Sequence, residues 1–196
     1  MIRPALIALA LLAAPAARAD DGTVREVVKS YAISGSTGRE LYDSIGRNGP
    51  LIRGGKTRTI AHTDYDLRWR RDYRKQGNAC VLAAATPILT ITTTLPKPKG
   101  KLPQATQAKW QTFITGIAAH EAVHAQLMRE LMQTIRATTV GLTVDNDPKC
   151  IKIREAIQTP LRAAVADYRA KTREFEEAEM RQGGNVWGLV VGLVLL

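Results

Sequence analysis

Hydrophobic residues follow two different periods in the two halves of the chain. In the first half, apolar and polar residues alternate along residues 65–73 and again along residues 89–95, which is typical of strands with one buried face. The turn-like sequence Gln76-Gly77-Asn78 separates the two stretches. Residues 56–95 therefore predict a long antiparallel hairpin with one apolar side.

Two shorter elements are expected before the hairpin. Residues 24–33 read as a strand, which Gly35 then ends. Thr37, followed three residues later by Glu40, is a capping-box pattern that starts a helix. We expect this short helix to end near Gly46, ahead of the sequence Asn48-Gly49-Pro50.

Helical spacing of apolar residues dominates the second half. A first long helix is expected to begin near Gln104, and residues 141–148 form a loop after it. A second helical stretch runs from Cys150 to about Arg181 and is kinked or restarted at Pro160. The buried stripe of the first helix comprises Trp110, Phe113, Ile114, Ile117, Val123, Leu127, Leu131 and Ile135.

The chain divides into three parts. Residues 1–19 combine a cationic start, an apolar run and the small-residue site Ala17-Arg18-Ala19, which predicts a signal peptide cleaved after Ala19 and a periplasmic or secreted protein. Residues 20–185 predict one α+β domain, β-rich over 24–95 and helical over 104–182. In it, a small antiparallel sheet with one short helix packs on two long helices.

The tail, residues 186–196, allows two interpretations. It is almost wholly apolar, but its 11 residues are about half of what a transmembrane helix needs. We therefore expect no membrane span in the mature chain. The tail either packs into the core or against a partner, or makes a shallow contact with a membrane surface.

Composition limits the class of protein. With 45% hydrophobic and 23% charged residues and a net charge of +10, the chain does not read as a polytopic membrane protein. Loss of Arg3 and Arg18 with the signal peptide leaves +8. This charge would steer the protein toward an anionic envelope surface, although the row of Arg68, Arg70 and Arg74 also fits a solvated strand face. Nucleic acid is not an expected partner of an exported chain.

The two cysteines are expected to pair. Cys80 and Cys150 form no Cys-x-x-Cys motif, which disfavours a thiolate metal site. Thiols in an oxidising compartment tend to form disulfides. We expect a Cys80–Cys150 bridge.

The sequence His120-Glu121-Ala122-Val123-His124 lies within the first long helix. Histidines at i and i+4 project from one side of a helix and can hold one metal ion, and imidazole ligands suit zinc. The adjacent Glu121 would then act as the general base on a zinc-bound water. The alternative is a helix with two histidines satisfied within the core.

A catalytic zinc ion needs a third protein ligand. His62 is the only other histidine and is either a surface residue or a proton donor near the site. The second helical stretch offers carboxylates, of which at most one is expected to be a ligand. These are Asp167, Glu174, Glu176, Glu177 and Glu179.

Further motifs carry a resemblance to a known family. They are, in order, the sequence from Tyr31 to Thr37, Glu40-Leu41, Gly49-Pro50, His62-Thr63-Asp64-Tyr65, Trp69, Cys80, Leu95-Pro96, Trp110, His120 to His124, and Cys150. Together they resemble a family of bacterial domains of unknown function described as predicted secreted zinc-dependent proteases. The resemblance covers about residues 26–175.

The resemblance implies a third zinc ligand. The family pattern Tyr-Asp-x-x-Thr-x-His-Gly matches Tyr168 and Thr172, while Arg169, Glu174 and Phe175 depart from it. On this alignment Glu174 replaces the family histidine as the third ligand, or else the site binds zinc weakly. Tyr168 would either pack against the core or donate a hydrogen bond to an oxyanion.

The predicted function is a zinc-dependent metallopeptidase that hydrolyses peptides or proteins. One alternative is a zinc-dependent amidase acting on cell-wall peptides, which shares the metal chemistry. Another is a non-catalytic envelope protein that uses the same scaffold for binding or assembly.

Overall fold

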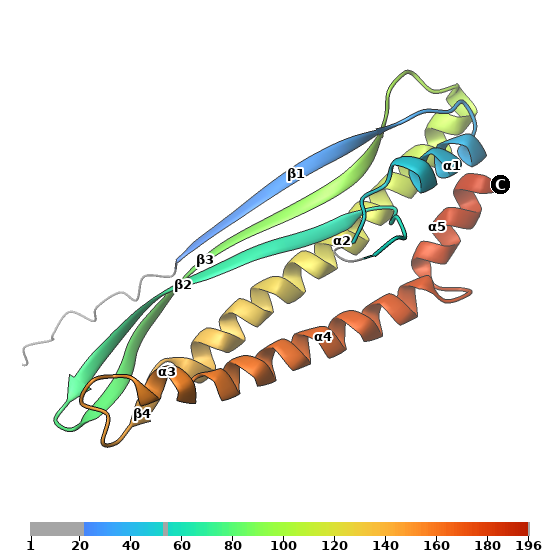
Figure 1. Cartoon of the computed structure of the whole chain (residues 1–196). Coiled ribbons are helices and arrows are strands. Elements are labelled where there is room, and N and C mark those ends of the chain that lie inside the picture. Colours follow the sequence, from blue (N-terminus) through green and yellow to red (C-terminus); the bar gives the residue numbers. More distant parts are fainter. Residues whose placement is uncertain (1–21, 53–54, 196) are drawn as a thin grey trace, which may run out of the picture.

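A long twisted sheet covers one side of two long helices in the computed structural model (Figure 1). The structure describes residues 22–52 and 55–195, so the predicted signal peptide lies outside the described residues. The order of the paired strands is β1-β3-β2, and the two-residue strand β4 (Thr143–Val144) pairs with the beginning of β3.

The predicted hairpin is confirmed. Strands β2 (His62–Gln76) and β3 (Ala79–Pro98) pair antiparallel, and they are joined by a tight turn in which Gly77 adopts a positive φ of 61°. Alternate residues of β3, among them Leu89 and Ile91, are buried against the helices. The register between the strands shifts once, between Asp72 and Tyr73.

The sheet is mixed, whereas an all-antiparallel sheet was expected. Strand β1 (Thr23–Ile33) pairs in parallel with β3. After β1 the chain forms helix α1 (Gly38–Asn48) and then returns along the far edge of the sheet as β2. Because β3 runs back between them, antiparallel to β2, it has the same direction as β1. The alternation of apolar and polar residues along a strand shows which face is buried, but it does not show which strand pairs with it or in which direction.

The capping box of α1 is confirmed, and the helix ends two residues later than expected. The backbone N–H of Glu40 donates to Thr37 Oγ1 at 3.2 Å, and the backbone N–H of Thr37 donates to Glu40 Oε2 at 3.1 Å. Two N–H groups that lack helical partners are thereby satisfied.

The helical half contains α2 (Gln104–Thr139), α3 (Lys152–Ala156) and α4 (Gln158–Met180). The predicted stripe of α2 lies largely inside, with Trp110, Phe113 and Ile117 all at most 5% exposed. The second helical stretch restarts at Gln158, which places Pro160 in the first turn of α4. Proline lacks a backbone N–H group, but N–H groups in the first turn have no acceptor within the helix, so Pro160 removes no hydrogen bond of α4.

The apolar tail forms helix α5 (Asn185–Val194), which packs on the other helices. Its residues Val186 and Leu193 are buried in one cluster with Ile33 and Phe113. The helix backbone approaches α1 closely, because a Cβ atom at Gly38 would collide with the carbonyl of Leu193. This arrangement corresponds to the core-packed interpretation of the tail.

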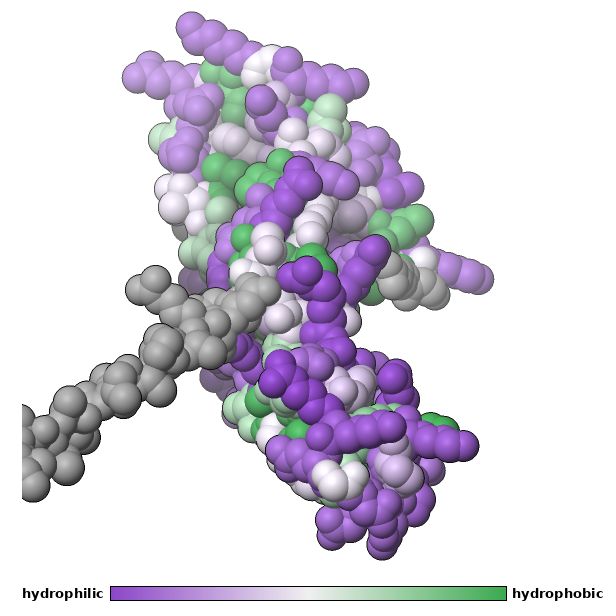
Figure 2. Space-filling model, turned by 90° about the vertical axis from the view of Figure 1, so that its left-hand side faces the viewer, coloured by the Kyte–Doolittle hydropathy of each residue, from purple (hydrophilic) through white to green (hydrophobic). Residues whose placement is uncertain are grey.

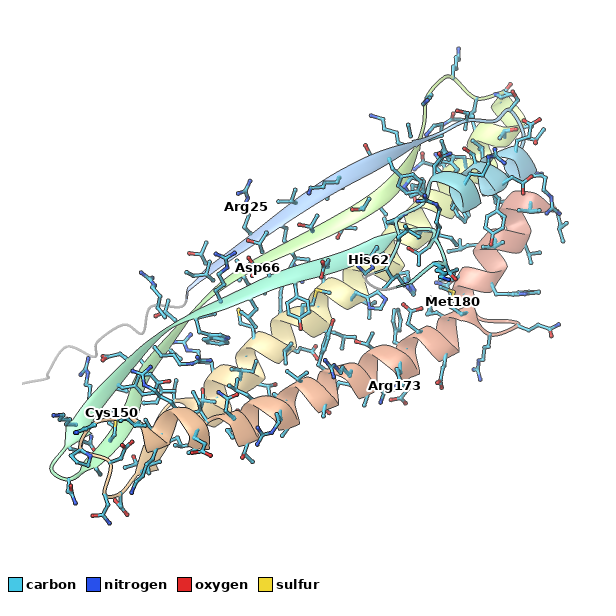
Figure 3. All side chains as sticks on the ribbon, in the orientation of Figure 1. Arg25, His62, Asp66, Cys150, Arg173 and Met180 are labelled. Carbon is cyan, nitrogen blue, oxygen red and sulfur yellow. A yellow bond between two sulfur atoms is a disulfide. The ribbon has the colours of Figure 1, made fainter. Side chains whose placement is uncertain are left out.

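Polar side chains cover the exposed face of the sheet. Arg25 projects away from the helices (Figure 3), and the guanidinium groups of Arg68 and Arg74 each lie 2.8 Å from a neighbouring aspartate. On the face of the molecule seen in Figure 2, hydrophilic side chains predominate. Among the described residues, no helix combines the length and the apolarity needed to cross a bilayer.

The predicted disulfide is present. Cys80 at the start of β3 is bonded to Cys150 just before α3, across a sequence separation of 70 residues. Both cysteines are buried together with Leu82, Ile153 and Ile157. The bridge therefore fixes the hairpin to the connection between the two long helices.

Replacing both cysteines by serine should destabilise the protein strongly. Closing a loop of this length is worth roughly 4 kcal/mol in the chain-entropy model. Urea unfolding of the double variant, followed by circular dichroism, should show this loss of unfolding free energy. The wild type unfolded with a reductant present should give the same midpoint. A midpoint unchanged in both would contradict a structural role for the bridge.

Candidate metal centre

The His-Glu-x-x-His residues lie on the buried face of α2. His120, Glu121 and His124 are 5%, 5% and 8% exposed, so all three side chains are removed from solvent. The Nε2 atoms of the two histidines are 3.2 Å apart, and their rings meet edge to face with centroids 4.9 Å apart. Phe175 of α4 stacks on the His120 ring at 4.8 Å.

A carboxylate from α4 completes the cluster. Glu176 Oε1 lies 2.9 Å from His124 Nε2 and 3.6 Å from His120 Nε2. The ligand atoms of these three residues all lie within 4.8 Å of one another, which makes them a group that could hold a metal ion.

Glu174, the carboxylate expected from the family alignment, does not face the histidines. It is exposed, whereas Tyr168, Thr172 and Glu176 line the cavity at the metal centre. At 100° per residue, Glu174 is rotated by about 200° from Thr172, whereas Glu176 is rotated from Thr172 by only about 40°. The helical period therefore points to Glu176, and the structure does not bring Glu174 to the histidines.

A second carboxylate orients His120. Glu179 Oε2 lies 3.3 Å from His120 Nδ1, on the side of the ring opposite Nε2. The side-chain amide of Asn185, the first residue of α5, donates to the same oxygen of Glu179 at 3.2 Å. A carboxylate at the outer nitrogen of a metal-binding histidine fixes both the tautomer and the ring orientation. The chain from α5 through Glu179 thus reaches the metal centre.

Glu121 is held from the sheet. The hydroxyl of Thr63 on β2 donates to Glu121 Oε2 at 2.7 Å, and Thr63 Oγ1 is also 3.1 Å from Thr93 Oγ1 on β3. Thr63 is itself buried. Sequence reasoning assigned no role to Thr63 or Asn185, and it considered Glu179 only as one of five candidate third ligands. The inward position of Thr63 in the alternating strand was the only available sequence signal for its contact with Glu121. The 3.6-residue period of the helix was the signal for Glu179.

Electrostatics couple the cluster internally. Interactions with the His120 and His124 rings lower the pKa of the Glu176 carboxyl to about 2. Burial disfavours the charged form of His120, but its contacts with Glu176 and Glu179 outweigh burial and raise the pKa of the ring. The Glu176 carboxyl group is therefore ionised at neutral pH, which is the form that binds a metal ion.

A cavity of about 480 Å³ opens beside the cluster and is bordered by His120, Glu121 and His124. Tyr168 borders it as well, and its ring meets that of Tyr65 edge to face at 5.8 Å. His62, the first residue of β2, borders both this cavity and a depression on the outer face of the sheet.

Comparison with known proteins identifies the family. Residues 28–184 match the family model described as "Bacterial protein of unknown function (DUF922)", and the chain belongs to this family. The matched segment ends one residue before α5. Neither the curated proteins nor the solved structures contain a match to this chain.

Replacing Glu176 by alanine should weaken metal binding, whereas replacing Glu174 by alanine should not. Only Glu176 presents an oxygen to both histidines. Titration of metal-free protein with Zn²⁺, monitored by calorimetry, measures both dissociation constants. If Glu174→Ala weakened Zn²⁺ binding and Glu176→Ala did not, the third ligand would instead be Glu174, as the family alignment indicates.

Removing the outer contacts of His120 should also weaken Zn²⁺ binding. Loss of such a contact typically reduces metal affinity 10–100-fold. We expect this loss for Glu179→Ala and a smaller one for Asn185→Ala, which acts only through Glu179. The matched control is Glu177→Ala, an exposed position on the same helix. Equal Zn²⁺ affinity in all three variants would show that Glu179 does not support metal binding.

Proposed function

We propose that this protein is a periplasmic or secreted zinc-dependent metallopeptidase. The observation that supports it most directly is the spacing of the three ligand atoms, 2.9, 3.2 and 3.6 Å. Tetrahedral zinc with bonds of about 2.0–2.1 Å keeps its ligands about 3.3 Å apart. Two imidazoles and one carboxylate are also a donor set used by catalytic zinc. The residues present therefore fit the ion.

In this proposal His120, His124 and Glu176 hold the zinc ion. When bound, the ion supplies a lowered pKa for water and polarisation of the substrate carbonyl. Glu121 takes the proton from the attacking water and returns it to the leaving amine. The hydrogen bond from Thr63 fixes the direction of the Glu121 carboxylate, because Thr63 is itself held in β2 by its pairing with Thr93 of β3.

In this proposal Tyr168 stabilises the oxyanion, because it borders the cavity beside the histidines. Burial, together with the nearby Tyr65, raises the pKa of its hydroxyl. The phenol therefore stays protonated at neutral pH and is available as a donor in the cavity. His62 borders the same cavity and is a second donor for the developing charge or for the leaving group.

The location follows from two features. The predicted signal peptide directs the chain out of the cytoplasm, and a disulfide persists in an oxidising compartment. Extended or unfolded polypeptides are the proposed substrates, because the cavity lies at the edge strand β2.

Replacing Glu121 by glutamine should abolish turnover and leave the metal in place. Glutamine keeps the shape and still accepts a hydrogen bond from Thr63, but it cannot take a proton. Loss of a general base costs about 10²–10⁴-fold in rate. Digestion of an unfolded protein substrate, with metal content measured in parallel, checks both effects.

Glu177→Gln serves as the control on an exposed position. Undiminished hydrolysis by the Glu121 variant would refute the mechanism. Cleavage of muropeptides alone would point to the amidase alternative. Absence of any hydrolysis by zinc-loaded wild type would favour the binding or assembly protein.

A further inference from the structure

The cavity beside the metal centre is walled mainly by apolar side chains. Ile117 and Met128 of α2 lie on either side of the histidines along the helix and are 2% and 3% exposed. Val186 of α5 borders the cavity as well and is 2% exposed. Two helices that are far apart in the sequence thus form one hydrophobic chamber.

The mouth of the cavity is also apolar. Met180 at the end of α4 (Figure 3) and Ile52 after α1 border the cavity, yet they are 50% and 47% exposed. Large apolar side chains exposed beside a hollow are typical of a site that receives an apolar group.

Few charged side chains line the described part of the cavity. Among the described residues that line it, the carboxylates are those of Glu121 and Glu176, both at the metal centre, and no lysine or arginine is present. A charged substrate side chain placed deeper would lose its hydration without gaining a partner, which is strongly unfavourable.

An open cavity of about 480 Å³ with a largely apolar lining is unfavourable when only water fills it, because apolar surface then stays in contact with water. The volume falls in the range of about 300–1,000 Å³ that is usual for ligand sites. The position, directly beside Glu121 and the histidines, explains why this space is kept open.

We propose that this cavity binds the side chain next to the scissile bond, and that the substrates are polypeptides with a large uncharged apolar residue at that position. The inference rests on the proposed peptidase function. It separates such polypeptides from cell-wall peptides, whose side chains are mostly small or charged.

The first test maps cleavage sites. An unfolded protein is digested with the zinc-loaded enzyme, and the cut bonds are identified by mass spectrometry. Bonds next to Leu, Ile, Phe or Met should be cut at least about 10-fold more often than those next to Asp, Glu, Lys or Arg. Equal frequencies would overturn the inference and leave the proposed peptidase intact.

A pair of variants at the mouth tests the cavity itself. Met180 is half exposed, so the chain should tolerate both Met180→Lys and the matched control Met180→Leu. The lysine variant should lose at least about 10-fold in cleavage next to leucine and gain in cleavage next to glutamate. The leucine variant should keep the original preference. An unchanged preference in the lysine variant would overturn the assignment.

An experiment that measures binding without hydrolysis distinguishes the proposed apolar side-chain site from the proposed peptidase function. Short hydroxamates bind zinc through the hydroxamate group, and they can carry either an isobutyl side chain or only hydrogen. The isobutyl compound should bind the zinc-loaded protein at least about 10-fold more tightly by calorimetry. Equal affinities would overturn the inference even if no peptide is cleaved. Tighter isobutyl binding without any hydrolysis would instead contradict only the peptidase function.

Discussion

The packing of α2 against α4 depends on buried polar side chains that satisfy one another's hydrogen bonds and charges. Two imidazoles and the Glu121 carboxylate lie almost wholly out of solvent, where an unpaired charge or donor would be strongly destabilising. Each is satisfied from another element: the histidines by Glu176 and Glu179, and Glu121 by Thr63. These contacts exist only when the sheet and both helices pack in one register. The polar cluster therefore specifies the packing as well as the chemistry.

The scaffold holds this cluster from both ends. At one end, the disulfide joins the hairpin to the chain between the long helices. At the other end, α5 packs against α1 and α2 and contacts Glu179 through Asn185. The metal centre lies between these two anchors, so relative sliding of α2 and α4 is opposed on both sides. Such restraint is what a preorganised site requires.

Local patterns in the sequence predicted local structure well, and the contacts between elements were harder to predict. The capping box of Thr37 and Glu40, the hairpin turn at Gly77 and most of the stripe of α2 are properties of neighbouring residues and were correctly placed, whereas Val123 of the predicted stripe is 39% exposed. The parallel pairing of β1 was missed because strand order leaves no trace in alternation. Glu174 was chosen from a family pattern, although the helical period favours Glu176. Asn185 has no sequence signal, since its role arises only when α5 docks.

The position of α5 also bears on the timing of folding. Asn185 and Val186 are synthesised after both histidines. A nascent chain that ends before α5 can therefore form the helix with both histidines, but it lacks the outer support of Glu179 and one wall of the cavity. The complete site can assemble only after α5 has been synthesised and has docked.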